Sequence, residues 1–260
     1  MTSINSIVCI KSVVLSAPDG VGRRTAENSD LNPFDRPALE AALGIKKAQG
    51  GTVTALTMGP EVGVEALAEA KAMGVDGAVL ISDPALAQSD TLITARVLAA
   101  AIDRLTPYAF VFFGTRSSDS DTGQVGPQTA TLLRVPFVSG VRRMQPESDA
   151  WEITRLMDEW EETWRIRGPA AVTIHAGSFP PKPVSLPGIA QAYDGFNVRT
   201  WSLADLGLSA GSVGLTASPT RVAALRKVKR QRTCRMLEGE PAQQAEALMK
   251  CLAAKGLTGS

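Results

Sequence analysis

The sequence has very few of the residues that most catalytic centres need. It contains one histidine, His175, and three cysteines, Cys9, Cys234 and Cys251, among 260 residues. A single histidine excludes multi-histidine metal sites, and the cysteines show no metal-ligand spacing. The serine nucleophile motif G-x-S-x-G is missing as well. We therefore predict no catalytic residue, no metal site and a structural role for His175, so that a bound cofactor would carry any chemistry.

Strong net charge and long apolar segments are also missing. The formal net charge is +1, which argues against nucleic acid as the main partner. No apolar run approaches the ~20 residues of a membrane span, and the scattered cysteines are typical of a reducing compartment. These features predict a cytoplasmic protein with no membrane span. The hydrophobic content of 44% is enough for a sizeable core.

Apolar strands alternate with amphipathic helices in the first half of the chain. The expected strands span residues 6–14, 51–59, 76–82 and 108–114. The expected helices span residues 32–50, 61–74, 90–105 and 126–134. Asn32 is the expected N-cap of the first helix, with Pro33 in its first turn. This alternation predicts an α/β fold with an open, mostly parallel, twisted sheet of Rossmann-like type, which binds ligands beyond the carboxyl ends of its strands.

The second half has shorter apolar runs with charges between them. Residues 137–176 predict an antiparallel meander, in which Trp151, Trp160 and Trp164 occupy half-buried positions. Residues 178–208 are rich in proline and glycine and show no periodicity, which is typical of a functional loop.

A basic run at residues 226–235 and an amphipathic helix at residues 241–255 close the chain. The basic run is either a solvated face or a contact with an acidic partner subunit. We predict an α/β domain over residues 1–200, which includes the meander and the long loop. A C-terminal arm over residues 201–260 follows it.

A polar, glycine-rich loop follows the apolar strand at residues 108–114. Its sequence, GTRSSDSDTGQVGPQTATLL, has no lysine and one arginine, so an anion bound here would rely mainly on backbone N–H groups. Gly123 and Gly126 would allow close approach of a ligand, whereas Asp119 and Asp121 would repel a phosphate if directed at it. The alternative is an ordinary helix start without a ligand. Neither G-x-G-x-x-G nor G-x-x-x-x-G-K-[ST] occurs, which disfavours an ordinary dinucleotide site or a P-loop.

Five segments resemble the electron transfer flavoprotein β subunit, in the same order and spacing. They are IVCIKSVV, NPFDRPALEAAL, LTMGPEVGVEALAEAKAMGVDGAVLI, DSDTGQVGPQTATLL and VSLPGI. The resemblance implies an α subunit that holds FAD, and electron transfer between a donor and a flavoprotein dehydrogenase or a quinone reductase. It also implies an adenine nucleotide in the β subunit. This is AMP or, in the electron-bifurcating branch that DTGQVGP resembles more closely, a second FAD that takes hydride from NADH.

The resemblance also implies particular contact residues. The implied nucleotide contacts are Cys9, Lys11, Asn32, Met58, Asp119, Asp121, Thr122, Gly123, Gln124, Val125, Gly126 and Thr129. The implied docking residues for the partner dehydrogenase are Leu186, Pro187 and Ile189, with Leu186 as the anchor. The alternative for that segment is a loop packed on its own domain. The alternatives for the whole chain are an ATP- or AMP-binding stress-type α/β module without a redox role, and a structural subunit whose pocket has decayed.

Overall fold

The computed structural model describes residues 4–14, 25–194, 196–224 and 234–257. Contacts divide the chain into two compact units, Met1–Arg221 and Val222–Ser260. Most of the basic run predicted at residues 226–235 lies outside the described residues. Within the described ranges, no helix is both long enough and apolar enough to cross a membrane.

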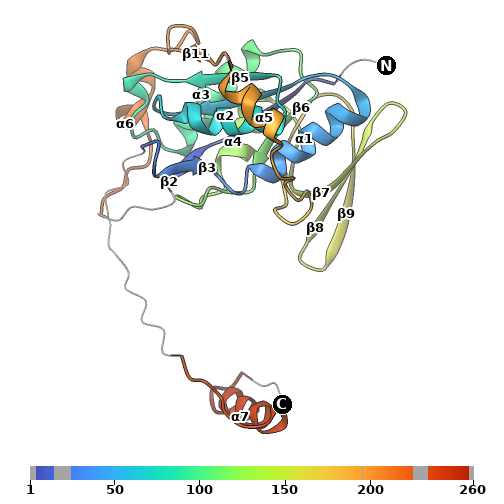
Figure 1. Cartoon of the computed structure of the whole chain (residues 1–260). Helices are drawn as coiled ribbons and strands as arrows, with labels where there is room; N and C mark the ends of the chain where they lie inside the picture. Colours follow the sequence, from blue (N-terminus) through green and yellow to red (C-terminus); the bar gives the residue numbers. More distant parts are fainter. Residues whose placement is uncertain (1–3, 15–24, 195, 225–233, 258–260) are drawn as a thin grey trace. The chain divides into compact units, whose positions relative to one another are not determined.

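A nine-stranded sheet, counted over the described residues, forms the centre of the first unit (Figure 1). Its strand order is β11-β5-β4-β1-β6-β10-β7-β8-β9, with parallel pairing from β11 to β7 and antiparallel pairing of β8 and β9. The strands are β1 (Ser6–Cys9), β4 (Val53–Met58), β5 (Gly77–Ile81), β6 (Phe110–Gly114), β7 (Phe137–Pro146), β8 (Trp151–Met157), β9 (Trp160–Ile166), β10 (Ala170–Ile174) and β11 (Arg199–Trp201). The predicted fold class, an open and mostly parallel α/β sheet, is confirmed.

Helices cover both faces of the parallel part of this sheet (Figure 1). They are α1 (Arg36–Gln49) and α2 (Gly63–Met73) on one face, and α3 (Thr91–Arg104) and α4 (Val125–Leu133) on the other. Val8 of β1 packs with the first pair and Ile7 with the second, because successive strand residues point to opposite faces. Both faces are therefore dry, which explains why the central strands are continuous apolar runs.

The strand order reverses at β1. From β1 the chain moves outward to β4 and β5, with α1 and α2 as the crossovers. Helix α3 then returns the chain across the opposite face to β6, which pairs with the other side of β1. Open α/β sheets bind their ligands at the carboxyl ends of the two neighbouring strands between which the strand order reverses, here β1 and β6. The loop after β6 therefore starts at the expected ligand position.

The first predicted strand, residues 6–14, is in fact two strands. After β1 the chain bends at Lys11, and β2 (Ser12–Val14) pairs with β3 (Ser29–Leu31) in a separate antiparallel sheet. The backbone N–H of Lys11 donates to Asp35 Oδ2 at 2.8 Å instead of to a neighbouring strand. This side-chain acceptor ends the main-sheet strand, and nothing in the apolar pattern of the sequence indicated it.

The antiparallel meander is shorter than predicted and consists of β7, β8 and β9. Strand β10 inserts between β6 and β7 and pairs in parallel with both. All of its residues are buried, as expected for a strand covered on both faces. Trp151 is half-buried as predicted, but the prediction is wrong for Trp160 and Trp164, which are 77% and 43% exposed.

Two helix predictions also need correction. Helix α1 begins at Arg36 with Asp35 as its N-cap residue, because the Asn32 side chain bonds to a distant loop and does not cap the helix. Residues 178–208, predicted to lack regular structure, contain β11 and the short helix α5 (Leu186–Tyr193). The hydroxyl of Ser185 accepts the Gly188 N–H at 3.1 Å at the start of α5.

Packing on α2 explains why α5 forms although its sequence shows no periodicity. A Cβ at Gly188 would collide with the backbone carbonyl of Ala72, so glycine permits a very close approach of the two helices. Ala192 is buried in the same helix. Since helices this short are marginal on their own, the tertiary contact stabilises α5.

The segment after β11 belongs with the first unit. Leu203 and Val213 are buried in its core, and Ser218 Oγ accepts the Asp90 N–H at 2.9 Å. The domain boundary predicted at residue 200 lies before this segment, and the division at Arg221 lies after it. In the second unit, α7 (Pro241–Ala254) forms where the last helix is predicted.

Candidate functional site

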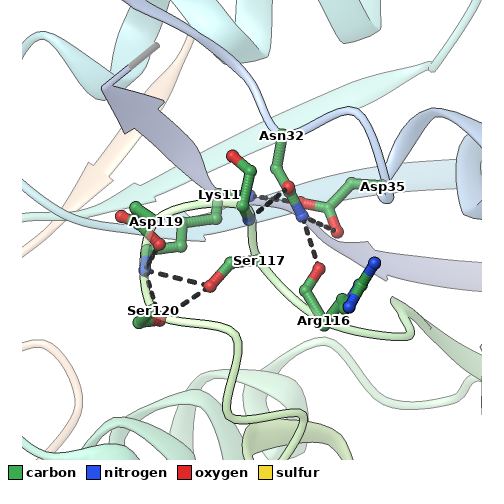
Figure 2. Close-up of polar contacts among 8 residues, drawn as sticks. Lys11, Asn32, Asp35, Arg116, Ser117, Asp119 and Ser120 are labelled. Atoms are coloured by element: carbon green, nitrogen blue, oxygen red, sulfur yellow. Dashed lines mark hydrogen bonds and ion pairs between the residues drawn. The ribbon is translucent and has the colours of Figure 1, made fainter. Parts of the chain in front are cut away.

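Lys11 organises the first part of the loop that follows β6 (Figure 2). Its Nζ lies 2.6 Å from Asp119 Oδ1. It also donates to the hydroxyls of Ser117 and Ser120, at 3.4 and 3.3 Å. The side chain therefore joins the end of β1 to the loop after β6, across the point where the strand order reverses. Asp119 is neutralised by this cation.

Arg116 organises the same loop from its other side. Its NH1 lies 3.1 Å from Asp121 Oδ1, and its guanidinium lies over the Phe34 ring, 4.6 Å from the centroid. Both loop aspartates are thus paired with cations. The repulsion of a phosphate that these aspartates would exert alone is largely cancelled.

The backbone of residues 122–126 carries the feature best suited to an anion. No acceptor among the described residues takes the N–H groups of Thr122, Gly123, Gln124, Val125 or Gly126. Asp121 and Gly123 have φ values of +54° and +63°, and they turn the chain into the start of α4. Unpaired N–H groups at a helix N-terminus favour a phosphate or another anion.

Gly126 and Thr129 hold α4 on the sheet. A Cβ at Gly126 would lie 3.3 Å from Thr173 Cγ2 and 3.4 Å from Phe113 Cγ. Thr129 is fully buried, and its hydroxyl donates to the Val125 carbonyl at 2.7 Å. The close approach that glycine permits at residue 126 is therefore to β6 and β10. That Gly126 also allows close approach of a ligand stays a prediction.

Asn32 fastens the loop from inside the protein (Figure 2). Only 1% of the residue is exposed. Its Nδ2 donates to Asp35 Oδ1 and to the Arg116 carbonyl, both at 2.9 Å, and its Oδ1 accepts the Ser118 N–H at 3.2 Å. Both amide hydrogens are used within the protein. Asn32 thus holds the loop after β6 in place.

Asp35 is the residue of this site that the sequence did not reveal. It is 4% exposed, and its carboxylate accepts hydrogen bonds from Lys11 N–H and Asn32 Nδ2. Burial raises the pKa of Asp35 to about 7, although hydrogen bonds from Lys11, Asn32 and Gly114 act in the opposite direction. In the sequence it lies inside the helix expected at residues 32–50, and nothing there marked it as a site residue.

Cys9 and Met58 lie at the carboxyl ends of β1 and β4, as expected for the predicted site. Cys9 is 6% exposed and packs in the core beneath α3 and α4. Burial, followed by the nearby Asp35 carboxylate, raises the pKa of the Cys9 thiol, so the sulfur stays protonated. Neither residue brings a charged group to the site.

His175 follows β10, where its Nδ1 accepts the Gly177 N–H at 3.2 Å. The same nitrogen lies 3.2 Å from Ser178 Oγ. These contacts shape the turn after the strand and agree with a structural role.

The predicted docking residues lie on α5. Leu186 is 83% exposed and Ile189 is 42% exposed, and Pro187 is also exposed. The segment before α5 is attached to α1, because Glu40 Oε1 accepts the Lys182 N–H at 3.0 Å. The segment therefore packs on its own unit and leaves the Leu186 side chain in solvent, and docking on a partner through Leu186 stays a prediction.

We expect Gly114→Ala to destabilise the chain, because a Cβ there would collide with Asp35 Oδ1 and with the Phe34 carbonyl. Overpacking of this kind costs about 1–3 kcal/mol of unfolding free energy. The control is Gly44→Ala in α1, where nothing lies within 4 Å of the added carbon. It should stabilise the chain by about 0.5–1 kcal/mol, since alanine is the better helix former. Urea unfolding followed by circular dichroism measures both, and an unchanged midpoint for Gly114→Ala would contradict this packing.

The fold and the site together define a doubly wound α/β protein whose helix N-terminus, at the switch point of the sheet, suits a nucleotide phosphate. The chain belongs to the electron transfer flavoprotein family, because the family model described as "Electron transfer flavoprotein domain" matches residues 20–205. This finding confirms the family resemblance seen in the sequence, and electron transfer is the function class that follows from it.

Individual relatives agree with this family. The electron transfer flavoprotein subunit beta of Thermoanaerobacterium thermosaccharolyticum is 36% identical over 86% of this chain and 86% of its own. The caffeyl-CoA reductase-Etf complex subunit CarD of Acetobacterium woodii is 37% identical over 83% of this chain and 85% of its own. Protein FixA of Bradyrhizobium diazoefficiens is 34% identical over 84% and 81% of the two chains.

Proposed function

We propose that this chain is the β subunit of an electron transfer flavoprotein heterodimer. Its α subunit would hold an FAD and exchange electrons with a donor and with a flavoprotein dehydrogenase or a quinone reductase. The chain itself binds an adenine nucleotide, shapes the heterodimer and docks the dehydrogenase. Membership of the flavoprotein family leaves no support for the alternative of a stress-type nucleotide module. The cytoplasmic location predicted from the sequence remains a prediction.

The observation that carries the nucleotide proposal is the row of unpaired N–H groups from Thr122 to Gly126. These groups lie at the start of α4 and beside two aspartates that are already paired with cations. A phosphate is the adenine-nucleotide group that fits such donors. The residues present therefore fit the phosphates of FAD and of AMP alike.

We favour FAD over AMP because DTGQVGP is closer to the electron-bifurcating branch. A bound FAD would supply the redox chemistry that lets NADH act as a hydride donor, whereas AMP has none. In either case the protein contributes binding and orientation. NADH oxidation by the heterodimer is therefore proposed only for the case with two flavins.

Exposed apolar side chains in both compact units support the proposed partners. In the second unit, α7 has no buried residue, and it leaves Leu248 and Met249 about half exposed, at 48% and 55%. We assign this amphipathic helix to contact with the α subunit. In the first unit, Leu186 on α5 is the proposed anchor for the dehydrogenase.

Nucleotide release from the co-expressed heterodimer tests the proposal. We expect the denatured complex to release the FAD of the α subunit and one further adenine nucleotide, measured by chromatography and absorbance. Two FAD per heterodimer would support NADH oxidation, and one FAD with one AMP would restrict the function to simple electron transfer. One FAD and no other nucleotide would contradict the phosphate site in this chain.

A further inference from the structure

The Asp35 carboxylate lies where three backbone segments converge at the carboxyl edge of the sheet (Figure 2). It accepts hydrogen bonds from the N–H of Lys11 at the end of β1 and from Asn32, and its Oδ1 lies against Gly114 at the end of β6. Gly114 has no Cβ, and a Cβ there would occupy the position of the carboxylate. Asp35 therefore connects the two strands at which the strand order reverses.

The carboxylate also determines how the Asn32 amide is oriented. An ionised carboxylate only accepts hydrogen bonds, so Asn32 must turn its NH2 group toward Asp35. The second amide hydrogen then reaches the Arg116 carbonyl, and the amide oxygen accepts the Ser118 N–H. The reverse orientation would place two acceptors together and two donors together. One carboxylate thus favours the amide orientation in which Asn32 makes two contacts to the loop at residues 115–121, with Arg116 and with Ser118.

The charged groups around Asp35 are engaged with other partners. Two titratable groups interact directly with Asp35, the Cys9 thiol and the Lys11 ammonium. The neighbouring segments also carry the charged residues Asp30, Arg36, Arg116, Asp119 and Asp121. The cations pair as Lys11 with Asp119, Arg36 with Glu69 and Asp30, and Arg116 with Asp121. The Cys9 thiol is neutral, since burial and then Asp35 raise its pKa. Asp35 is therefore the group of this cluster that changes charge near neutral pH.

We propose that Asp35 is a positioning residue of the nucleotide site: its ionised carboxylate orients Asn32 and so holds the loop after β6 in the conformation that presents the N–H groups of residues 122–126 to a phosphate. This inference rests on the proposed function, since it concerns the same site. Asp35 itself does not touch the ligand. It acts through Asn32 and the loop backbone.

The ionisation of Asp35 gives the proposal a measurable signature. Hydrogen bonds to a neutral carboxyl are weaker than those to a carboxylate, so protonation loosens the loop. Burial raises the pKa of Asp35 to about 7, so the ionised fraction rises steeply between about pH 6 and pH 8. If only the ionised form binds well, nucleotide affinity should rise about tenfold over that interval.

Stability should change in the opposite direction, which separates positioning from a merely structural role. The pKa of Asp35 is higher in the folded chain than in the unfolded chain, whose ordinary value is 3.8. The unfolded state therefore binds fewer protons between these two values, and the contribution of Asp35 to stability is lost as the pH rises through them. Affinity that rises while stability falls is not expected of a residue that only supports the fold.

The test uses the nucleotide-depleted heterodimer, with FAD and AMP as separate probes of the β site between pH 6 and pH 8. We expect Asp35→Asn to weaken nucleotide binding about tenfold at pH 8, because the amide places an N–H against another donor. We also expect the variant to lose the pH step, which is the rise in affinity between pH 6 and pH 8. The control, Asp76→Asn, removes a carboxylate that accepts the Val53 N–H at the opposite edge of the sheet, and should keep the step. The phosphate of AMP has a pKa of ~6, so AMP binding changes with pH for that reason also. This contribution is the same in wild type and in Asp35→Asn, and it cancels when the two pH profiles are subtracted.

The following outcomes would contradict the positioning role of Asp35 or the proposed function. Wild-type affinity for FAD that does not change between pH 6 and pH 8 overturns the positioning role, even if Asp35→Asn fails to fold. Wild-type affinity for AMP that does not change with pH once the profile of Asp35→Asn is subtracted overturns it as well. An Asp35→Asn complex with wild-type affinity and pH profile overturns it as well. A wild-type heterodimer whose β site binds neither FAD nor AMP overturns the proposed function itself, and the positioning role with it.

Discussion

The heterodimer carrying Gly123→Val is expected to purify without nucleotide in the β subunit and with the flavin of the α subunit intact. Gly123 has a φ of +63°, a conformation that is a genuine outlier for a β-branched residue. An added Cβ would also lie 3.1 Å from the Thr115 carbonyl. Backbone strain of this kind costs about 1–3 kcal/mol, which the loop avoids by leaving the conformation that presents its N–H groups.

This strain energy of about 1–3 kcal/mol predicts a loss of nucleotide affinity of roughly 5- to 150-fold, since about 1.4 kcal/mol corresponds to a factor of ten. The matched control is Gly207→Val, because Gly207 has a similar φ of +67° and nothing within 4 Å of an added Cβ. It should lose stability but keep its nucleotide. Chromatography of the released nucleotides measures both variants. Full nucleotide occupancy in Gly123→Val would show that the loop conformation is not needed for binding.

Leu186→Ala is expected to leave the flavin spectrum unchanged and to weaken binding of the dehydrogenase. The side chain is 83% exposed at the start of a helix that is fixed on α2, so it is accessible from solvent. Truncating an anchor of this type typically costs about 2 kcal/mol of binding free energy. That corresponds to a roughly 30-fold weaker complex, because about 1.4 kcal/mol is tenfold.

Leu132→Ala on α4 is the control, since this leucine is also solvent-exposed, at 44%. Electron transfer from the reduced heterodimer to the dehydrogenase, followed at several dehydrogenase concentrations, separates weaker docking from slower transfer. We expect Leu186→Ala to need a higher dehydrogenase concentration and Leu132→Ala to match wild type. Equal behaviour of both variants would remove Leu186 as the anchor.

The local pattern of the sequence was sufficient for the central α/β layers. Continuous apolar runs predicted β4, β5 and β6, and the 3.6-residue period predicted α1, α2 and α3. The polar, glycine-rich stretch before α4 indicated an anion site at the carboxyl edge of the sheet. Segment order and spacing also identified the family. These features depend on neighbouring residues or on composition, which a sequence displays directly.

Tertiary structure decided the features that depend on residues far apart in the chain. The sequence did not indicate that β10 lies between β6 and β7, because a buried apolar run does not specify the strands with which it pairs. It did not indicate α5 either, since a close approach to α2 stabilises that short helix. Asn32 was expected to cap a helix, whereas its amide bonds to Asp35 and to the loop after β6.

Asp35 is the clearest example of a residue whose burial and pKa depend on tertiary structure. In the sequence it is one aspartate inside the helix expected at residues 32–50, with nothing to mark it as unusual. In the structure it is 4% exposed, bonded to Lys11 N–H after β1 and packed against Gly114 at the end of β6, and this burial raises its pKa to about 7. Sequence determined the elements, the family and the loop. Only the folded chain brought Lys11, Asn32 and Gly114 around one carboxylate, because burial and long-range hydrogen bonds arise when distant segments meet.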